Sequence, residues 1–483
     1  MNKNLEIKLK KYFGDMLVYK SSGNTKFFSA LSLPSFMRDW LVMRFSDEDG
    51  NIDTEEISDY VRSVIPKEEQ WNKYMMNMLL HGEHSRFLTK VKIEFDTRNR
   101  RALFSLPDFS FPNKKEDAVA DWNVVEQNQK YLMSSNEIWG IVELSCCEDS
   151  QTKKNIFRLV DFVPFCPYTI DINYYKEARK NFSVDEWIDI LLGAIDYNPQ
   201  GFETQNQKIS MLKRLLPFVE KRLNLIELAP KETGKSYIFS NISKYGWLIS
   251  GGSITRAKMF FDMNRKTTGL VSHYDYVAFD EIQSITFKKD ALEMQGALKG
   301  YLESGEYRVG NDRKTGNAGL ILLGNIDSYL MNENKNMFTD LPEIFRESAL
   351  LDRFHGFIKG WSIPKMKENL KANDWALNSE YFSEIIHSLR DELNYRIVVD
   401  QMLDIPKNAS TRDTEAIKRI CTGFLKLLFP HVESTEQIDE NDFEIYCLRP
   451  AKEMRGIIKT QLGILDFGEF GHSTIPDIKT RHL

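Results

Sequence analysis

Cysteine is scarce in this sequence, and the marks of an exported or membrane-spanning chain are missing. The cysteines are Cys146, Cys147, Cys166, Cys421 and Cys447. This odd and sparse set argues against a disulfide framework, and it contains no paired knuckle for zinc. No run approaches the roughly 20 apolar residues of a membrane span, and the first residues lack the apolar core of a signal peptide. We expect a cytoplasmic protein that has no membrane partner.

An excess of positive charge is also absent. Lys and Arg number 64 against 70 Asp and Glu, which gives a formal net charge of −6. This excludes a nucleic-acid binder that is basic over its whole surface, but it is compatible with a basic channel inside an acidic shell. What is present is an ordinary globular composition with 42% hydrophobic residues. The 483 residues are enough for two or three domains.

Residue patterns divide the chain into three predicted domains. Residues 1–200 mix helical and strand periodicity, including an OB-like sheet at about 88–165, and predict an α+β domain that binds DNA or serves as an adaptor. In residues 201–375, short apolar strands alternate with helices, which predicts a parallel sheet with helices on both faces. The strand candidates are 223–228, 246–250, 274–279 and 319–323. Residues 376–483 predict a helical lid and a short tail without strands, with helices at 378–403, 411–429 and 448–464.

A phosphate-binding loop follows the first of these strands. It consists of Ala229, Pro230, Lys231, Glu232, Thr233, Gly234, Lys235 and Ser236, and matches the Walker A pattern except that Ala replaces the first Gly. In such a loop backbone N–H groups surround the phosphates, Lys235 reaches the β/γ oxygens and the Ser236 hydroxyl ligates Mg²⁺. Glu232 must point away from the phosphates, because a carboxylate there would weaken nucleotide binding. The loop predicts ATP and Mg²⁺ as cofactors.

Two acidic residues, Asp280 and Glu281, end the strand candidate at 274–279. Their distance from Lys235 along the chain is typical of a Walker B motif. Asp280 is expected to hold the Mg²⁺ shell, and Glu281 to orient and deprotonate the attacking water. An isolated Asp-Glu pair often only caps a strand, but here the loop and the spacing agree with the catalytic interpretation.

Three further polar residues fit a nucleotide site. Asn325 follows the last buried strand and is a candidate for holding the attacking water, the role called sensor 1. Arg353 is a candidate arginine finger that stabilises charge in the active site of the next subunit; the alternative is a surface ion pair with Asp352. Arg449, at the start of the last long helix, is the candidate sensor 2, and Arg455 is the competing choice.

The order of these motifs resembles that of AAA+ ATPases in the clade of the minichromosome-maintenance helicases. A closer resemblance is to the BREX-system Lon-protease-like (BrxL) family of prokaryotic phage defence. The segments that carry it are ELAPKETGKSYIFSNISKYGWLISGGSITRAKMF, YDYVAFDEIQ, GALKGYLESGEYRVG, AGLILLGNI and LPEIFRESALLDRFHGFIKGW. The resemblance implies an AAA+ P-loop core with a helical lid, a ring of six or seven subunits, and DNA and other BREX-type defence proteins as partners.

The resemblance also gives a role to residues 305–317, which read as a hairpin. In the helicase clade the matching hairpin points into the ring channel and touches DNA phosphates, which implies DNA contacts for Arg308, Arg313 and Lys314. Composition alone supports a solvated loop equally well. The second candidate for DNA contact is the turn with Arg98, Arg100 and Arg101.

Longer members of the family carry a Lon-like domain after the lid. This sequence ends at Leu483, shortly after the last predicted helix, so we expect no protease activity. The predicted function is an oligomeric ring ATPase that binds DNA and couples ATP hydrolysis to clamping or translocation in BREX-type defence. The alternatives are an ATP-dependent protein-remodelling ATPase and a nucleotide-gated scaffold that does not translocate DNA.

Overall fold

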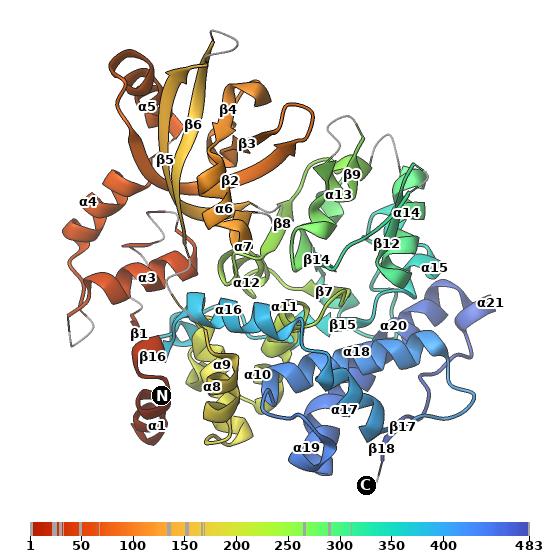
Figure 1. Cartoon of the computed structure of the whole chain (residues 1–483). Helices are drawn as coiled ribbons and strands as arrows, with labels where there is room; N and C mark the ends of the chain where they lie inside the picture. Colours follow the sequence, from red (N-terminus) through yellow and green to blue (C-terminus); the bar gives the residue numbers. More distant parts are fainter. Residues whose placement is uncertain are drawn as a thin grey trace. The chain divides into compact units, whose positions relative to one another are not determined.

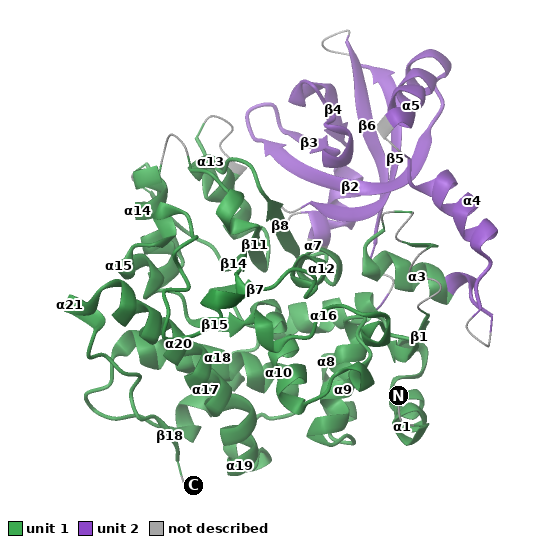
Figure 2. Ribbon diagram, turned by 180° about the vertical axis from the view of Figure 1, so that it is seen from behind, with its two compact units in different colours: residues 1–43, 170–483 green, residues 44–169 purple. Residues whose placement is uncertain are grey.

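The computed structural model describes residues 3–21, 27–28, 31, 33–47, 51–66, 68–132, 137–149, 154–165, 168, 170–263, 267–287, 291–310 and 312–481. The chain forms two compact units (Figure 2). One contains residues 1–43 and 170–483, and the other contains residues 44–169. The predicted functional borders at residues 200 and 375 stay a prediction.

The larger unit is built on a five-stranded parallel sheet (Figure 1). The strand order is β15-β7-β14-β11-β8, and every neighbouring pair is parallel. The strands are β7 (Leu225–Ala229), β8 (Gly246–Ser250), β11 (Tyr276–Asp280), β14 (Gly319–Asn325) and β15 (Gly356–Lys359). Four of them coincide with the predicted apolar runs; β15 is an additional edge strand that the sequence analysis missed.

Helices cover both faces of this sheet, which confirms the predicted α/β class. After residue 169 the larger unit contains the helices α8 (Ile172–Arg179), α9 (Val184–Ala194), α10 (Gln205–Leu212), α11 (Leu216–Val219), α12 (Lys235–Asn241), α13 (Arg256–Met259), α14 (Ala291–Ser304), α15 (Ser348–Leu351), α16 (Ser379–Leu389), α17 (Asn394–Met402), α18 (Thr411–Leu428), α19 (Glu440–Phe443), α20 (Arg449–Leu465) and α21 (Phe467–Phe470). On one face Val277 and Leu320 share a core with α14 and α20. On the other, the Tyr276 ring lies 4.3 Å from Phe218 and 5.5 Å from Phe239.

Two expectations for the C-terminal part are wrong. Strands continue to residue 375 and beyond, because β16 (Asp374–Leu377) pairs with β1 (Leu17–Lys20) and β17 (Leu403–Asp404) pairs with β18 (Lys479–Thr480). Such short strands carry almost no periodicity, and their partners are distant in sequence. The helix expected over 378–403 is divided into α16 and α17. Between them Arg390 donates to the carbonyl of Asn317 at 2.8 Å, a tertiary contact that local sequence does not reveal.

The chain's first helices are α1 (Lys3–Phe13) and α3 (Ser35–Phe45). The larger unit also carries two small hairpins, β9 (Phe261–Asp262) with β10 (Thr267–Thr268) and β12 (Glu306–Val309) with β13 (Asp312–Thr315). In the described part of the chain, no helix is long and apolar enough to cross a membrane.

The smaller unit contains a closed five-stranded barrel of order β2-β3-β4-β6-β5 (Figure 1). Its strands are β2 (Ser85–Asp96), β3 (Arg101–Ser105), β4 (Ala118–Ala120), β5 (Ile138–Glu148) and β6 (Asn155–Pro164), and its helices are α4 (Thr54–Val64), α5 (Glu68–His81), α6 (Trp122–Gln127) and α7 (Gln129–Leu132). Only β4 and β6 pair in parallel. Phe87, Val91 and Leu159 belong to the core of this barrel unit.

Candidate nucleotide-binding site

Three predicted residues meet at the carboxyl edge of the parallel sheet. Ala229 ends β7, Asp280 ends β11 and Asn325 ends β14. Ala229 and Asn325 are register partners in adjacent strands. In open α/β sheets this edge is where ligands bind, so the sheet places these residues where the sequence analysis expects a nucleotide.

Lys235, the first residue of α12, reaches this edge. Its Nζ lies 3.0 Å from Oδ1 of Asn325, and the side chain is buried. Burial lowers the pKa of Lys235, and the carboxylates of Glu227, Asp280 and Glu281 offset part of that shift. Within the described residues, the hydrogen-bond partner of the ammonium is a neutral amide. A buried ammonium with such a partner is suited to receive an anion.

The loop between β7 and α12 contains two residues in the left-handed region, Glu232 with φ 69° and Gly234 with φ 75°. A Cβ atom on Gly234 would lie 2.2 Å from Oη of Tyr197, so both conformation and space require glycine there. The Glu232 side chain is 74% exposed, and its carboxylate lies 3.9 Å from Nζ of Lys365. The carboxylate that the sequence analysis flagged therefore projects into solvent.

Ala229 replaces the first glycine of the Walker A pattern, and Gly360 provides the space for its methyl group. A Cβ atom on Gly360 would lie 2.1 Å from the Cβ of Ala229. There is room for a methyl group at only one of the two positions, 229 or 360. The departure from the pattern is thus accommodated by a residue that is remote in sequence.

The other loop residues divide into buried and exposed ones. Thr233 is buried, and its hydroxyl donates to the carbonyl of Pro230 at 3.2 Å. Lys231 and Ser236 are exposed. The Ser236 hydroxyl is therefore accessible at the start of α12, as a metal ligand needs to be.

A fully buried ion pair anchors the loop, and the sequence analysis missed it. Nη2 of Arg214 lies 2.5 Å from Oε1 of Glu227, and both side chains are fully buried. Nη1 of Arg214 donates to the carbonyl of Thr233 at 2.7 Å. Glu227 is the only charged residue in the apolar strand β7, and that lone carboxylate was the available signal.

The acidic pair at the end of β11 forms a tight turn. Asp280 is buried, and its Oδ1 accepts from the backbone N–H of Glu281 at 3.0 Å. Glu281 is exposed and adopts φ 47°, a left-handed conformation that is unusual for a residue with a side chain. Nε2 of Gln283 donates to the carbonyl of Asn325 at 2.7 Å, which ties this turn to the end of β14.

A cavity of about 270 Å³ lies beside the loop. Its lining includes Tyr19, Tyr197, Gly234, Tyr237 and Met366. Oη of Tyr197 is buried and has no hydrogen-bond partner among the described residues. Burial raises the pKa of Tyr197 to about 12, so the phenol stays protonated at neutral pH. The cavity thus contains flat apolar surface and an unused polar group.

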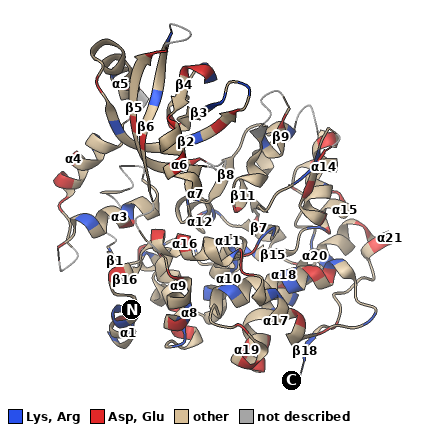
Figure 3. Cartoon of the chain, viewed as in Figure 1, with Lys and Arg blue, Asp and Glu red and all other residues tan. Residues whose placement is uncertain are grey.

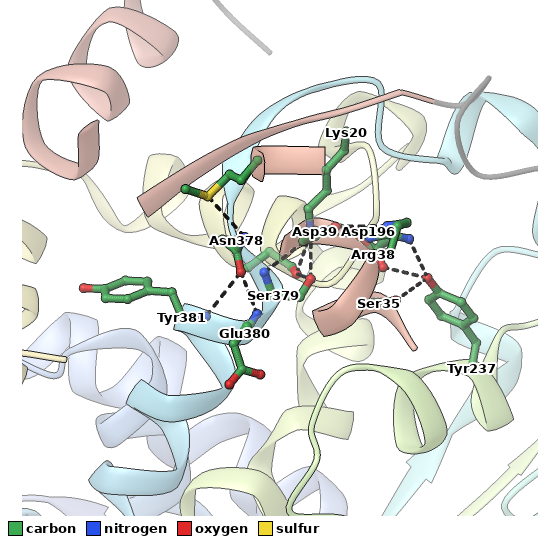
Figure 4. Close-up of polar contacts among 12 residues, drawn as sticks. Lys20, Ser35, Arg38, Asp39, Asp196, Tyr237, Asn378, Ser379, Glu380 and Tyr381 are labelled. Atoms are coloured by element: carbon green, nitrogen blue, oxygen red, sulfur yellow. Dashed lines mark hydrogen bonds and ion pairs between the residues drawn. The ribbon is translucent and has the colours of Figure 1, made fainter. Parts of the chain in front are cut away.

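Buried charges line another side of this cavity (Figure 4). Asp196 lies 2.6 Å from Nη2 of Arg38 and 2.8 Å from Nζ of Lys20, and it accepts a 2.6 Å hydrogen bond from the Tyr237 hydroxyl. Asp39 binds the same two cations at 2.7 and 3.3 Å. Burial opposes the charged form of Asp196, but Arg38 and Lys20 hold its pKa well below the usual range. The network fixes Tyr237, which belongs to the first turn of α12.

Arg353 does not form the ion pair with Asp352 that was the alternative to its catalytic role. Its Nε lies 2.7 Å from Oε2 of Glu303. Asp352 instead binds Arg412 at 3.0 Å and Arg455 at 2.6 Å. The Arg353 side chain is 17% exposed, so it lies close to the surface of this chain.

The two candidates for sensor 2 differ in environment. Arg455 is fully buried and binds Asp413 at 2.7 Å, and it donates to the carbonyls of Asp352 and Phe354 at 3.0 and 2.7 Å. Arg449 is exposed at the start of α20. Only Arg449 is accessible to a ligand, because Arg455 is committed to the core.

The predicted DNA-binding residues lie on the hairpin of β12 and β13, but on both of its faces. Arg308 and Arg313 are exposed register partners on one face. Lys314 alternates to the other face, where its Nζ lies 4.3 Å from the centre of the Phe261 ring. Arg256, which the sequence analysis missed, donates to the carbonyl of Arg308 at 2.8 Å and lines a neighbouring hollow of about 510 Å³.

In the barrel unit, Arg98 and Arg100 are exposed on the turn between β2 and β3, whereas Arg101 binds Asp149 at 2.9 Å. Cys146 and Cys147 are half-buried on β5, and Cys166 lies outside the described residues. Among the residues that the structure describes, no group of three or more His, Cys, Asp or Glu side chains is arranged to hold a metal ion.

Comparisons with known proteins match both units. Residues 157–475 match the family model described as "Lon-like protease BrxL-like, ATPase domain", and residues 11–146 match "BREX system Lon protease-like protein BrxL N-terminal". A Lon-like protease BrxL of Escherichia coli O9:H4 (strain HS) is 32% identical over 366 residues, which is 74% of this chain and 51% of that protein. One of Bacillus cereus (strain H3081.97) is 27% identical over 487 residues, covering 98% of this chain and 69% of that protein. The chain thus spans about half of the length of the first relative.

Proposed function

Because this chain belongs to the BrxL family, as its match to the family's ATPase domain over residues 157–475 shows, we propose that it is an AAA+ ATPase. In this proposal it assembles into a ring of six or seven subunits and acts on DNA in BREX-type phage defence. The observation that carries the ATPase assignment is the 3.0 Å contact between Lys235 and Asn325 at the carboxyl edge of the sheet. Residues 201–375 would form the ATPase core and 376–483 its helical lid.

The loop residues are proposed to bind the nucleotide, and the acidic pair is proposed to bind the metal and activate water. Lys235 and the backbone of residues 229–236 bind the phosphates, while Ser236 and Asp280 hold Mg²⁺. When bound, MgATP supplies the electrophilic γ-phosphorus and the metal that neutralises its developing charge. Glu281 takes the proton of the attacking water, and Asn325 orients that water.

The cavity beside the loop is suited to the nucleoside part of ATP. The rings of Tyr19, Tyr197 and Tyr237 offer flat apolar surface. The buried hydroxyl of Tyr197, which has no hydrogen-bond partner in the described part of the chain, supplies a donor for a base or sugar. The Asp196 network holds Tyr237 in place, which makes the binding surface rigid before the nucleotide arrives.

Two arginines complete the proposed site. Arg449, exposed at the start of α20, contacts the nucleotide from the lid of the same subunit. Arg353 lies near the surface and is paired with Glu303 in the isolated chain. In the ring we propose that it leaves Glu303 for the γ-phosphate of the neighbouring subunit.

The β12–β13 hairpin is the proposed DNA contact. Arg308 and Arg313 lie directly opposite each other, and like charges in that position destabilise a hairpin. Glu306 offsets part of this repulsion, because its Oε2 lies 3.6 Å from Nη1 of Arg313. Arg256 adds a third cation to the hollow beside them. A backbone phosphate would relieve this repulsion, whereas Lys314 contributes from the other face. Phosphate contacts of this kind bind without reading sequence.

The decisive test is the ATP hydrolysis rate of the full chain with no DNA, with duplex DNA and with single-stranded DNA. We expect hydrolysis that DNA stimulates, and we expect Lys235→Ala to abolish nucleotide binding. The Arg308→Ala/Arg313→Ala variant should keep basal hydrolysis and lose the stimulation. Hydrolysis that DNA never affects would favour protein remodelling, and ATP binding without turnover would favour a scaffold.

A further inference from the structure

Two large aromatic side chains stack on each other at the surface of the barrel unit. Phe95, near the end of β2, is 41% exposed, and Trp122, the first residue of α6, is 48% exposed. Their ring centroids are 6.0 Å apart with an angle of 18° between the planes. Exposed aromatic pairs of this size are uncommon on a soluble protein unless they serve as a binding surface.

The barrel does not use this pair to close its core. Neither Phe95 nor Trp122 belongs to the buried core of the barrel. That core is filled by their neighbours: Val91 and Ile93 precede Phe95 in β2, Ala102 is its register partner, and Ala120 precedes Trp122. Both residues therefore remain partly exposed to solvent. The stacking holds the rings in place and leaves flat aromatic surface available.

Cations adjoin the aromatic pair on a turn of defined shape. Arg98 and Arg100 are exposed on the turn that directly follows β2. Figure 3 colours the ribbon of the larger and smaller units by charge, with Lys and Arg in blue. Asp96 fixes the turn, since its Oδ1 accepts from the backbone N–H groups of Arg98 and Asn99 at 3.1 and 3.2 Å. The side-chain amide of Asn99 donates to the other oxygen of Asp96 at 2.7 Å, and these bonds lower the pKa of Asp96.

Two other charged residues near the pair are compensated. Asp121, next to Trp122, accepts two hydrogen bonds from Arg158 at 2.9 and 2.6 Å. Arg101 is bound by Asp149. Among the described residues, Arg98 and Arg100 form no ion pair within 4.0 Å, although the charge of Arg98 also acts on Asp96. Their exposed guanidinium groups can contact a ligand, and the site combines aromatic surface with positive charge.

From this arrangement we propose that Phe95 and Trp122, flanked by Arg98 and Arg100, form a stacking platform for the unpaired bases of a single-stranded nucleic acid. The rings stack with bases, and the guanidinium groups bind the adjoining phosphates. The barrel order β2-β3-β4-β6-β5, with one parallel pair, is that of OB-type barrels, whose first turn and adjacent strands bind oligonucleotides. A duplex is a poor ligand, because its bases are already stacked.

The platform residues belong to the smaller unit, whereas the residues of the proposed ATPase site and of the phosphate-binding hairpin belong to the larger one. The hairpin residues Arg308 and Arg313 contact backbone only, so they cannot distinguish a normal strand from one without bases. The barrel platform requires bases. The two sites can therefore be told apart with one pair of ligands.

The experiment measures binding of fluorescent oligothymidylate of about 15 nucleotides, a length that spans one such barrel, to the full chain. Arg308→Ala/Arg313→Ala/Lys314→Ala is the background, so that hairpin binding does not mask the result. We expect Trp122→Ala to weaken binding about tenfold or more, the usual loss for one stacking residue. Trp122→Phe should retain most of the affinity. Val163→Ala, a change at a 43% exposed residue of the same barrel, is the matched control and should bind normally.

Three further measurements define the ligand and the mechanism. An abasic strand of equal length should bind the background protein far more weakly than oligothymidylate. Oligouridylate compared with oligothymidylate distinguishes RNA from DNA, and a duplex should compete poorly with both. Tryptophan emission should be quenched by oligothymidylate in the background protein, and Trp122→Phe should remove that quenching while binding persists.

The proposal is overturned if Trp122→Ala binds oligothymidylate as tightly as its background, or if the abasic strand binds equally well. A thermal melt of Trp122→Ala checks that the barrel is folded. If this variant unfolds, two other variants test the proposal: Trp122→Phe should lose the quenching of tryptophan emission, and Arg98→Ala/Arg100→Ala should lose affinity for oligothymidylate. Neither negative result affects the proposed ATPase, which is judged by Lys235→Ala and by DNA stimulation.

Discussion

The ammonium group of Lys235 lies 3.0 Å from the side-chain oxygen of Asn325. These residues stand at the two sides of the proposed phosphate site, one on the loop after β7 and the other at the end of β14. A γ-phosphate would compete with Asn325 for the same ammonium. Binding of ATP would then release the Asn325 side chain to orient the attacking water.

Replacement of Asn325 is expected to separate binding from hydrolysis. Asn325→Ala should keep or slightly tighten ATP affinity, because Lys235 remains and its competing partner is removed. It should lower turnover about a hundredfold, the usual loss when one positioned polar group is removed. Isothermal titration with ATP and a steady-state phosphate assay measure the two quantities. Asn325→Asp is the informative comparison, since its carboxylate should hold Lys235 and weaken ATP binding instead. An Asn325→Ala protein that hydrolyses ATP at the normal rate would remove the sensor role.

The buried pair of Arg214 and Glu227 leads to a prediction about stability and affinity together. Arg214→Met should lower the unfolding free energy by about 3–5 kcal/mol, because Glu227 is left buried and unpaired. The double variant Arg214→Met/Glu227→Met should recover most of that stability. It should still bind ATP more weakly, since the carbonyl of Thr233 has lost its donor. Urea denaturation measures the unfolding free energy, and nucleotide titration measures ATP affinity. If the double variant recovers both fully, the ion pair stabilises the fold but does not contribute to ATP binding.

Comparison of these sites shows which contacts a sequence makes visible. The loop at 229–236 and the pair Asp280–Glu281 could be predicted, because each is a contiguous motif beside an apolar strand. The contact of Arg214 with Thr233 and that of Lys20 with Asp196 join residues that no local pattern connects. Gly360 is a similar case, since its role depends on the methyl group of Ala229.

The four inner and outer strands that are continuous apolar runs could be predicted from local sequence, but the edge strand β15 could not. Four strands are continuous apolar runs, whereas β15 has only four residues and ends in Lys359. Alternation along β13 places Arg313 and Lys314 on opposite faces, but the contact of Lys314 with Phe261 depends on tertiary packing and was hidden. The stacked pair Phe95–Trp122 joins two ordinary aromatic residues from separate elements, and only the folded barrel brings them together.

Glu232 offers a gain-of-function test of the loop. Its backbone adopts φ 69°, which costs a residue with a side chain about 1 kcal/mol relative to glycine. Glu232→Gly should therefore stabilise the protein by about that amount, and it should also tighten ATP binding by removing a negative charge near the phosphates. Glu232→Ala is the matched control, because it removes the charge and keeps the strain. Thermal melting should rise only for Glu232→Gly, while both variants should bind ATP more tightly.

Two half-buried histidines predict acid sensitivity. Burial lowers the pKa of His431 to about 4, and burial together with nearby arginines lowers that of His355 well below 6.5. Below pH 6.5 the unfolded chain therefore takes up protons that the folded chain does not, so the unfolding free energy must fall as the pH falls from 6.5 toward 4. Urea titrations at several pH values measure this slope. His431→Gln should flatten it, and an unchanged slope would show that His431 does not contribute.

The last prediction concerns the ring and Arg353. Arg455 donates to the carbonyls of Asp352 and Phe354, the residues on either side of Arg353, so the finger is carried on a fixed segment. Arg353→Ala subunits should keep an intact site of their own but fail to complete that of a neighbour, and Glu281→Gln subunits should do the reverse. Each variant alone should hydrolyse ATP at least about a hundredfold more slowly than the wild type.

When the two variants are mixed, a Glu281→Gln subunit can supply Arg353 to the intact site of an Arg353→Ala subunit. An equal mixture should recover about a quarter of the wild-type rate, because random assembly completes that share of the interfaces. Lys235→Ala mixed with Glu281→Gln is the control and should recover nothing, since both changes disable the same site. Energy transfer between labelled subunits verifies that the subunits exchange. If exchange occurs and activity stays at the level of the parents, Arg353 does not act across the interface, and its bond to Glu303 is its role.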